Sequence, residues 1–512
     1  MCGIFFYKGN IYDFDTLKSW AEKISHRGPD DHRYLNINDC FMGFHRLSVN
    51  GLNTMSGQPM IKNGIYLICN GEIYNFKKIA KEYNFVLETE SDCEIIIHLY
   101  IEFGIEKTVK SINGEFAFVI YDSNIDTVFV ARDPLGIRSL YWDYNAQFIT
   151  SEMKSIPTEI TTVNQFPNGL YAIIKNDNKI VSEYYNFNFQ INNRISYNDI
   201  LVNIKNTFEE CVHERLMSDR SIGCILSGGL DSTLVTAIVA RKVGGQNLNT
   251  YTIGLEGGVD LKYAKLASEY LNTKHHEFIV TEKEFLDCIE ETIYQVESWD
   301  TTTIRSSICN LLVCKKIKEV GSDVVIFCGD VSDEIFASYR GFQNAPDGES
   351  FLEENVKMLK NIKYFDVLRS DKSISGAGLE GRVPFGDAKF VDLIMSIPPH
   401  LKMFSKDKIE KKILREAFEG YLPHELLYRI KCAFSDSVSK KERSWSQIIK
   451  DYIDTKVTNE ECSSGDKESY YYRKIFDKYY PGRSHTIPYK WLHPFCPNQT
   501  DPSARTLDIH QE

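Results

Sequence analysis

Short apolar runs separated by turn-forming residues fill the sequence from residue 2 to residue 185. Runs such as Phe116–Tyr121 and Thr127–Ala131 lie between clusters of Asn, Gly and Asp, a pattern that is typical of strands in antiparallel sheets. Apolar residues with helical spacing predict helices at 15–25 and 91–103. We therefore predict a first domain, residues 2–185, in which antiparallel sheets are combined with a few helices.

The pattern changes after residues 186–196, a polar and Asn-rich stretch that we interpret as a linker. From there, segments with helical spacing alternate with short apolar runs, among them Ser221–Leu226, Thr250–Leu255 and Val324–Cys328. Strand–helix–strand alternation predicts a parallel sheet with helices on both faces. We therefore predict a second, α/β domain over residues 197–512.

Composition limits the classes of protein to which the chain can belong. It has 512 residues, of which 43% are hydrophobic, and a formal net charge of −12. The acidic balance argues against nucleic acid as a partner, and no apolar stretch reaches the ~20 residues of a membrane span. Thirteen scattered cysteines and an N-terminus without a secretory signal predict a cytoplasmic protein that has no disulfide framework or zinc module.

The segment Ser227–Ser232 (SGGLDS) lies between a predicted strand and a predicted helix. Its glycines allow the backbone to approach an anion, and a helix N-terminus supplies unpaired N–H groups. Asp231 can hold a divalent cation that bridges phosphates. The simpler alternative is a turn in which Ser or Asp caps the helix. No Walker A motif occurs; the segment resembles the loop of the ATP pyrophosphatases, which cleave ATP between the α and β phosphates.

Cys2 carries two reactive groups if the initiator methionine is removed. It then has a thiol and a free α-amine, whose ordinary pKa of ~7.7–8.0 suits a general base near neutral pH. Together these groups form a self-contained pair of nucleophile and base. The alternative is an ordinary second residue, and the position alone does not decide between the two.

Five further motifs follow Cys2: HRGPD at 26–30, HRLS at 45–48, NGEIYN at 70–75, SDCE at 91–94 and RDPLG at 132–136. In this order they resemble the class II glutamine amidotransferases. With SGGLDS and the later TDPSARTL at 500–507, nearly the whole chain resembles the family of glutamine-hydrolysing asparagine synthetases. The resemblance implies an N-terminal-nucleophile hydrolase domain, with antiparallel sheets sandwiched between helices, followed by an α/β ATP-pyrophosphatase domain with a parallel sheet.

The resemblance also implies roles for residues of the first domain. Cys2 would attack the side-chain amide of glutamine, and Asn70 and Gly71 would hold the oxyanion. The glutamine would be bound by Arg46, Val49, Asn70, Glu72 and Asp92. Ammonia would then pass through an internal tunnel to the second site, because ammonium, the form that dominates in neutral water, has no lone pair with which to attack.

In the second domain the resemblance implies a site for ATP and Mg²⁺ at which aspartate is amidated through a β-aspartyl-AMP intermediate. Asp231 and Asp333 would be the magnesium ligands, and Lys431 would neutralise the phosphates. Asp330 would act on ammonia or position the intermediate. The residues implied to bind ATP are Leu226, Ser227, Gly228, Gly229, Asp231, Ser232, Ile253, Cys328 and Gly329.

Five positions depart from the family pattern. The family usually shows S-G-E-G-S-D-E where this chain has Cys328–Glu334, CGDVSDE. Asp330 therefore replaces a glutamate and is one methylene shorter, and a displacement of ~1 Å can cost ~100-fold in rate. Val331 replaces a glycine, which is expected to bend the loop. Conversely, Gly381 and Gly386 stand where bulkier apolar residues are usual.

Other functions remain open at the level of sequence. The same scaffold could form a β-lactam, but the intact Cys2, Arg46 and Asn70 set and Lys431 argue against that reaction. A degenerate homologue with a regulatory or binding role, or an uncoupled glutaminase, is the remaining alternative because of Asp330 and Val331. The resemblance further implies the small-molecule substrates aspartate, glutamine and ATP, with a homodimer as a possible assembly.

Overall fold

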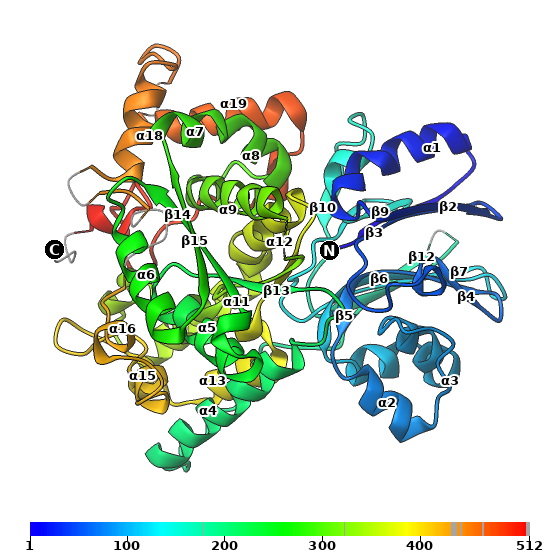
Figure 1. The fold of residues 1–512 in the computed structure, drawn as a ribbon. Helices are drawn as coiled ribbons and strands as arrows, with labels where there is room; N and C mark the ends of the chain where they lie inside the picture. The colour runs from blue at the N-terminus through cyan, green and yellow to red at the C-terminus, as the bar shows by residue number, and fades with distance from the viewer. Residues whose placement is uncertain (177, 322, 432–437, 441–442, 463–464, 508–512) are drawn as a thin grey trace.

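Two six-stranded antiparallel sheets lie face to face in the N-terminal part of the chain (Figure 1). The computed structural model describes residues 1–512 except 177, 322, 432–437, 441–442, 463–464 and 508–512. The first sheet contains, from edge to edge, β10 (Val163–Gln165), β8 (Tyr141–Asp143), β9 (Phe148–Thr150), β1 (Gly3–Lys8), β3 (Cys40–Arg46) and β2 (Asp31–Ile37). The second contains β12 (Asn178–Glu183), β11 (Leu170–Lys175), β7 (Thr127–Arg132), β6 (Gly114–Asp122), β5 (Ile65–Ile73) and β4 (Met60–Lys62).

Alternating side chains along the strands divide the apolar core of this part into layers. Ile4 on β1 and Ile68 on β5 belong to one apolar cluster, which lies between the two sheets. Leu67, also on β5, points the other way, into the cluster beneath the helices α2 (Phe76–Tyr83) and α3 (Glu94–Ser111). Because side chains alternate with a period of two, Asn70 shares the inter-sheet face with Ile68. The helix α1 (Phe14–Ala21) covers the outside of the first sheet (Figure 1).

The C-terminal part is built on a five-stranded, fully parallel sheet. Its order is β15 (Lys274–Val280), β14 (Asn249–Leu255), β13 (Ile222–Ile225), β16 (Val325–Phe327) and β17 (Glu380–Arg382). The contacting helices α4 (Tyr197–Glu214), α5 (Leu230–Val243) and α6 (Val259–Leu271) form one layer. The other layer is formed by α8 (Ile289–Val296), α9 (Thr301–Val320) and α12 (Asp366–Gly376), and the sheet lies between the two (Figure 1).

Further helices surround this core. They are α7 (Glu282–Asp287), α10 (Ser332–Phe336), α11 (Gly348–Asn361), α13 (Ala388–Ser396), α14 (Pro399–Lys402), α15 (Lys412–Ala417), α16 (His424–Leu427), α18 (Trp445–Asp454) and α19 (Lys467–Tyr479). Single turns of 3₁₀ helix connect many of them, including η5 (Arg340–Asn344) and η8 (Ser484–Thr486). Within the described residues, no helix has both the length and the apolar character needed to cross a lipid bilayer.

Buried ion pairs join the two parts of the molecule. The fully buried Arg27 contacts Glu152 at 2.8 Å and Asp371 of α12 at 3.0 Å. Its Nε also donates to the Cys2 carbonyl at 2.9 Å. Since an unpaired buried charge is costly, the pairing of Arg27 with Asp371 fixes α12 against the N-terminal sheets.

The fold class predicted from the sequence is confirmed, while several element boundaries differ. The predicted helix at 91–103 forms instead from Glu94 to Ser111. The predicted strand at Ile65–Cys69 continues to Ile73, because residues 65–73 pair with β6 over their whole length. The extension matters for function, since it places Asn70, Gly71 and Glu72 inside a strand.

Candidate active sites

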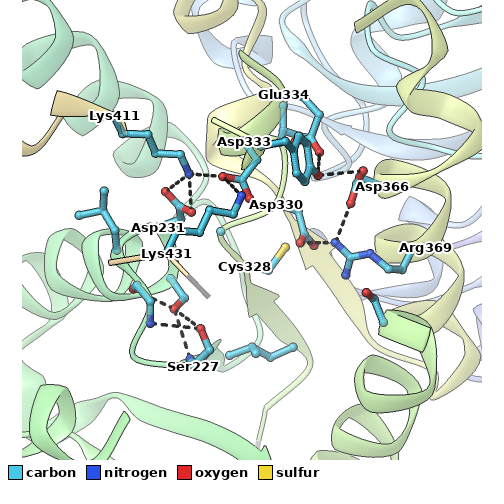
Figure 2. A pocket seen from close by; sticks show the side chains of 18 of the residues that line it. Ser227, Asp231, Cys328, Asp330, Asp333, Glu334, Asp366, Arg369, Lys411 and Lys431 are labelled. Carbon is cyan, nitrogen blue, oxygen red and sulfur yellow. Dashed lines mark hydrogen bonds and ion pairs between the residues drawn. The ribbon is translucent and has the colours of Figure 1, made fainter. Parts of the chain in front are cut away.

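A polar pocket opens at the carboxyl ends of the adjacent parallel strands β13 and β16. The segments that follow these strands, Ser227–Ser232 and Cys328–Asp333, form much of its wall. Ligands of open parallel sheets bind at this edge. Figure 2 shows the charged side chains that meet there. Of the predicted residues, the pocket is lined by Ser227, Gly229, Asp231, Ser232, Cys328, Gly329, Asp330, Asp333 and Lys431.

The predicted phosphate loop has the backbone shape that its glycines suggested. Gly228 has a φ of +72°, and a Cβ there would lie 2.4 Å from the Ala264 nitrogen, so no other residue fits without displacement. The hydroxyl groups of Ser227 and Ser232 hydrogen-bond at 2.9 Å across the loop. Gly229 then begins helix α5. Three of the residues predicted to bind ATP do not line the pocket: Leu226, Gly228 and Ile253.

Two carboxylates and two ammonium groups form a compact cluster beside the loop (Figure 2). Lys411 Nζ contacts Asp231 Oδ2 at 2.7 Å and Asp333 Oδ1 at 2.6 Å. Lys431 also pairs with Asp333. Burial alone would raise the pKa of Asp333, but the two ammonium groups outweigh burial and lower it well below its ordinary value. The cluster thus pairs two carboxylates with two ammonium groups, which keep Asp333 ionised.

Asp330 lies at the other end of the pocket, where it pairs with Arg369. Arg369 Nη2 donates to Asp330 Oδ1 at 2.7 Å and to Asp366 Oδ1 at 3.2 Å. The next residue, Val331, has φ 78° and ψ −19°, the left-handed conformation. A β-branched residue rarely adopts this conformation, whereas glycine adopts it readily. Val331 therefore keeps the backbone shape of the glycine expected at this position.

The predicted nucleophile Cys2 and the predicted oxyanion residue Asn70 both lie on the inter-sheet side of the N-terminal part. Cys2 is half-buried and packs against the inter-sheet cluster, the face that Asn70 shares. Asn70 is fully buried, and neither atom of its amide has a hydrogen-bond partner among the described residues. Because a buried amide without partners is costly, Asn70 is ready to bind a polar ligand. Burial raises the pKa of the Cys2 thiol, whereas the adjacent N-terminal amine lowers it.

Two of the predicted glutamine-binding residues, Arg46 and Val49, lie at and just after the end of β3, which pairs with β1 next to Cys2. Arg46 donates to the Asn53 carbonyl at 2.7 Å and lies close enough to Cys2 to interact with it electrostatically. Val49 is buried, and its carbonyl accepts a hydrogen bond from the Asp219 amide at 2.9 Å.

Two buried carboxylates complete this set. Asp92 accepts a hydrogen bond from the Ile73 amide at 2.5 Å, and burial raises the pKa of Asp92 to about 6. Burial, with the nearby charge of Asp92, also raises the pKa of Glu72. Glu72 lies 3.4 Å from Arg382. Since Arg382 is fully buried and also pairs with Glu380 at 2.9 Å, it has a structural role.

Comparison with known proteins identifies the family. The model of the glutamine amidotransferase domain matches residues 1–202, and that of asparagine synthase matches residues 203–358 and 343–494. The asparagine synthetase [glutamine-hydrolyzing] of Gallus gallus is 39% identical over 99% of this chain and 98% of its own length. The chain belongs to the asparagine synthetase family. A probable asparagine synthetase [glutamine-hydrolyzing] of Acanthamoeba polyphaga mimivirus is 36% identical over 99% of this chain and all of its own.

Solved structures show a more distant likeness. A glutamine phosphoribosylpyrophosphate amidotransferase from B. subtilis matches 54% of this chain and 81% of its own, with 14% identity and a TM-score of 0.32. This value is too low to carry an argument about function. The assignment to the asparagine synthetase family rests on the sequence matches, which extend over the full length.

The structure adds residues that sequence reasoning missed in this asparagine synthetase homologue. Lys411 is separated from Asp231 by 180 residues and bridges both predicted magnesium ligands. Tyr339, Trp491 and His493 also line the pocket. None of the four belongs to a local motif, so only the tertiary structure brings them to the site. One available signal was the lysine-rich segment around Lys411.

Proposed function

We propose that this protein forms asparagine from aspartate, ATP and glutamine, and releases AMP, pyrophosphate and glutamate. The observation that carries the proposal is the pocket in which a phosphate loop, two carboxylates and two lysines meet. It is supported by relatives that are named glutamine-hydrolysing asparagine synthetases and match at full length. A chain that retained only glutaminase activity would have no need for this balanced charge cluster.

At the first site, Cys2 attacks the side-chain carbonyl of glutamine. Its own α-amine, free after removal of Met1, accepts the thiol proton. The unpartnered amide of Asn70 and the backbone N–H of Gly71 bind the oxyanion as it develops, where preorganised donors are most effective. Arg46 binds the α-carboxylate, and Asp92 with Glu72 binds the α-ammonium, while Val49 contributes to the wall of the site. The oxyanion collapses to a thioester as ammonia leaves with the proton that the α-amine had accepted. Water then releases glutamate from the thioester.

At the second site, the loop Ser227–Ser232 binds the phosphates of ATP. Cys328 and Gly329 contact the adenosine, and the buried Leu226 and Ile253 support this wall from behind. The β-carboxylate of aspartate attacks the α-phosphorus and pyrophosphate leaves, which yields β-aspartyl-AMP. Lys431, together with Lys411, moves onto the phosphates and stabilises the departing charge. Ammonia from the first site then displaces AMP, while Asp330 receives or directs the ammonia protons.

Magnesium fits the donor set of this pocket. Carboxylates are the oxygen ligands that Mg²⁺ prefers. Asp231 and Asp333 both contact the single Lys411 ammonium within 2.7 Å, so they can reach one cation. In the described part of the chain, no cluster of three or more His, Cys, Asp or Glu converges; the remaining ligands would be phosphate oxygens and water. Bound there, magnesium would neutralise charge on the phosphates.

Three further features belong to this proposal. The boundary between the two catalytic domains lies at residues 186–196, which contain neither helix nor strand. The protein works in the cytoplasm, which is supported by twelve described cysteines that form no disulfide. It works as a homodimer, as the resemblance to the family implies.

The test is a single incubation of purified protein with ATP, Mg²⁺, aspartate and glutamine. Asparagine, glutamate and pyrophosphate are quantified together. Near-equal amounts of all three support the coupled reaction. Glutamate alone would favour an uncoupled glutaminase, and no turnover of any substrate would favour a regulatory or binding role.

A further inference from the structure

The C-terminal segment returns to the synthetase pocket and forms part of its wall. After α19 and η8, the chain passes along the pocket between residues 487 and 503, a stretch that we call the C-terminal strap. Trp491, His493 and Pro502 of the strap line the same pocket as Asp330 and Lys431. The strap is therefore part of the site, although none of the motifs that indicated an ATP site lies within it.

Buried partners hold the strap in place. The backbone nitrogen of Trp491 donates to Asp300 Oδ1 at 2.7 Å. Further along, Asp501 pairs with the buried Arg305 at 2.9 Å. The strap also passes very close to Gly341 of η5, where a Cβ would lie 2.1 Å from the Pro494 carbonyl oxygen. These contacts fix the strap at both ends and in the middle, so its side chains have defined positions.

His493 is the polar side chain that the strap contributes to the pocket. It is only 7% exposed, and its Nδ1 has no hydrogen-bond partner among the described residues. The ring also interacts with the Pro502 carbonyl. Because Nδ1 has no partner, we assign this contact, and the proton of the neutral ring, to Nε2. Burial, with the nearby Lys431 charge, lowers the pKa of His493 to about 3. The imidazole is therefore neutral, and its Nδ1 lone pair is an unused acceptor.

The carboxylates at this end of the pocket each have a donor already. Asp330 and Asp366 accept hydrogen bonds from Arg369. Glu334 accepts one from the Tyr339 hydroxyl, and the ring centroid of Tyr339 lies 6.1 Å from that of His493. Since a buried acceptor without a donor is costly, the Nδ1 position calls for a ligand that brings an N–H group.

The geometry of the reaction identifies that ligand. The phosphates of ATP would lie on the loop at Ser227–Ser232, and the β-carboxylate of aspartate must point toward them. The α-carbon end of aspartate then points away from the loop, toward the end of the pocket where the strap lies. Its α-ammonium is the N–H donor that belongs there.

We propose that His493 is a substrate-contacting residue whose Nδ1 accepts a hydrogen bond from the α-ammonium of aspartate, and that the C-terminal strap thereby determines specificity for the amino acid. This inference rests on the proposed function, because it assumes that aspartate occupies the pocket with ATP. It assigns a role to a side chain outside every motif that the sequence analysis identified.

The test compares His493→Phe with His493→Asn, using ammonia in place of glutamine. Phenylalanine keeps the aromatic volume but has no acceptor, whereas the asparagine Oδ1 occupies the place of Nδ1. A hydrogen bond to a charged group implies that His493→Phe raises the KM for aspartate about 10- to 100-fold. The KM values for ATP and ammonia should stay unchanged, and His493→Asn should recover most of the loss. An unchanged KM for aspartate, or a rise in the KM for ATP or ammonia instead, overturns the proposal.

A second pair of variants moves the strap without changing any pocket side chain. In Gly341→Ala the new Cβ meets the Pro494 oxygen and also lies 3.0 Å from the His493 Cβ. Gly348→Ala is the matched control, because its Cβ has only an ordinary contact of 3.4 Å with Pro399. We expect Gly341→Ala to raise the KM for aspartate and Gly348→Ala to leave it unchanged. Equal values for the two variants would contradict the role of the strap.

Thermal stabilisation by added amino acids separates this inference from the proposed function. If the unmodified protein forms no asparagine, the proposed function fails. If aspartate nevertheless stabilises the unmodified protein and does not stabilise His493→Phe, the aspartate contact at His493 stands on its own. If the protein forms asparagine and aspartate stabilises both proteins equally, the inference fails while the proposed function holds.

Discussion

Arg369 holds Asp330 through a hydrogen bond of 2.7 Å between Nη2 and Oδ1. The same guanidinium contacts Asp366 at 3.2 Å, one helical turn earlier on α12. The carboxylate that replaces the usual glutamate of the family is thus neither exposed nor unpaired. Burial would lower the pKa of Arg369, but Asp330 and Asp366 outweigh burial and raise it. The shorter side chain is held in a fixed place by a cation.

We expect Asp330→Glu to maintain or raise synthetase activity. Arg369 has a long, flexible side chain and a second partner in Asp366, so it can withdraw by the length of one methylene. The measurement is pyrophosphate release with aspartate and ammonia, and glutaminase activity of the same preparation is the internal control. A tenfold or larger drop in synthesis alone would show that the loop has adjusted to aspartate.

Lys411→Met should lower the rate of pyrophosphate release about 100- to 1,000-fold, the usual cost of removing one preorganised electrostatic contact. The variant leaves Asp231 without an ammonium partner, while Asp333 keeps Lys431. Lys412→Met is the matched control, because Lys412 lies next in the chain, is 46% exposed and pairs only loosely with Glu416 at 3.5 Å. Similar rates for the two variants would remove Lys411 from the mechanism.

Cys2→Ala should abolish the use of glutamine and leave synthesis from ammonia intact. The second pocket contains none of the residues of the first, so it can take ammonia from solution. Asparagine formation is measured with each nitrogen donor in turn. Cys40→Ala, which removes a buried thiol at the far end of β3, controls for the loss of sulfur. Loss of both activities in Cys2→Ala would contradict the division of labour between the two sites.

Glutamine binding should weaken as the pH falls below about 6. Burial raises the pKa of Asp92 from its ordinary 3.8 to about 6, and only the ionised carboxylate attracts the ammonium of glutamine. The effect on folding stability has the opposite sign. Because burial raises the pKa of Asp92 in the folded protein, the free energy of unfolding falls as the pH rises from 3.8 to about 6. The dissociation constant of glutamine, measured in Cys2→Ala between pH 5 and 8, tests the first statement. Adding Asp92→Asn should weaken binding and reduce its pH dependence through this range.

Local motifs predicted the parts of the sites that depend on backbone shape. The SGGLDS loop needs only a strand, two glycines and a helix start, all of which are visible in sequence. In contrast, the strand that carries Asn70 and Glu72 extends past its apolar run because it pairs with β6. Polar residues in a strand give no such signal. Lys411 and His493 reach the pocket from distant segments, which a single sequence does not reveal.

The sequence shows where the chain departs from the family pattern, but it does not show how each departure affects the packing. Gly381 lacks the bulkier side chain that is usual at this position, but Ile374 fills the space. Its Cδ1 lies 2.6 Å from the place that a Cβ of residue 381 would take. Gly386 is compensated similarly by Ile137, at 2.8 Å. Compensation of this kind arises from contacts between residues far apart in the chain, so the sequence alone shows only the substitution.

Helix α12 faces both halves of the molecule, and this has a consequence for how the protein can be divided. Arg369 points into the ATP pocket, while Asp371, two residues later, pairs with Arg27 beside Cys2. Cutting the chain between the halves would leave Asp371 without its cation on a newly exposed apolar surface, while Arg27 would keep only Glu152. Breaking such a buried pair costs about 3–5 kcal/mol. Neither half is therefore equipped to exist alone, and heat or denaturant should unfold both in one cooperative transition.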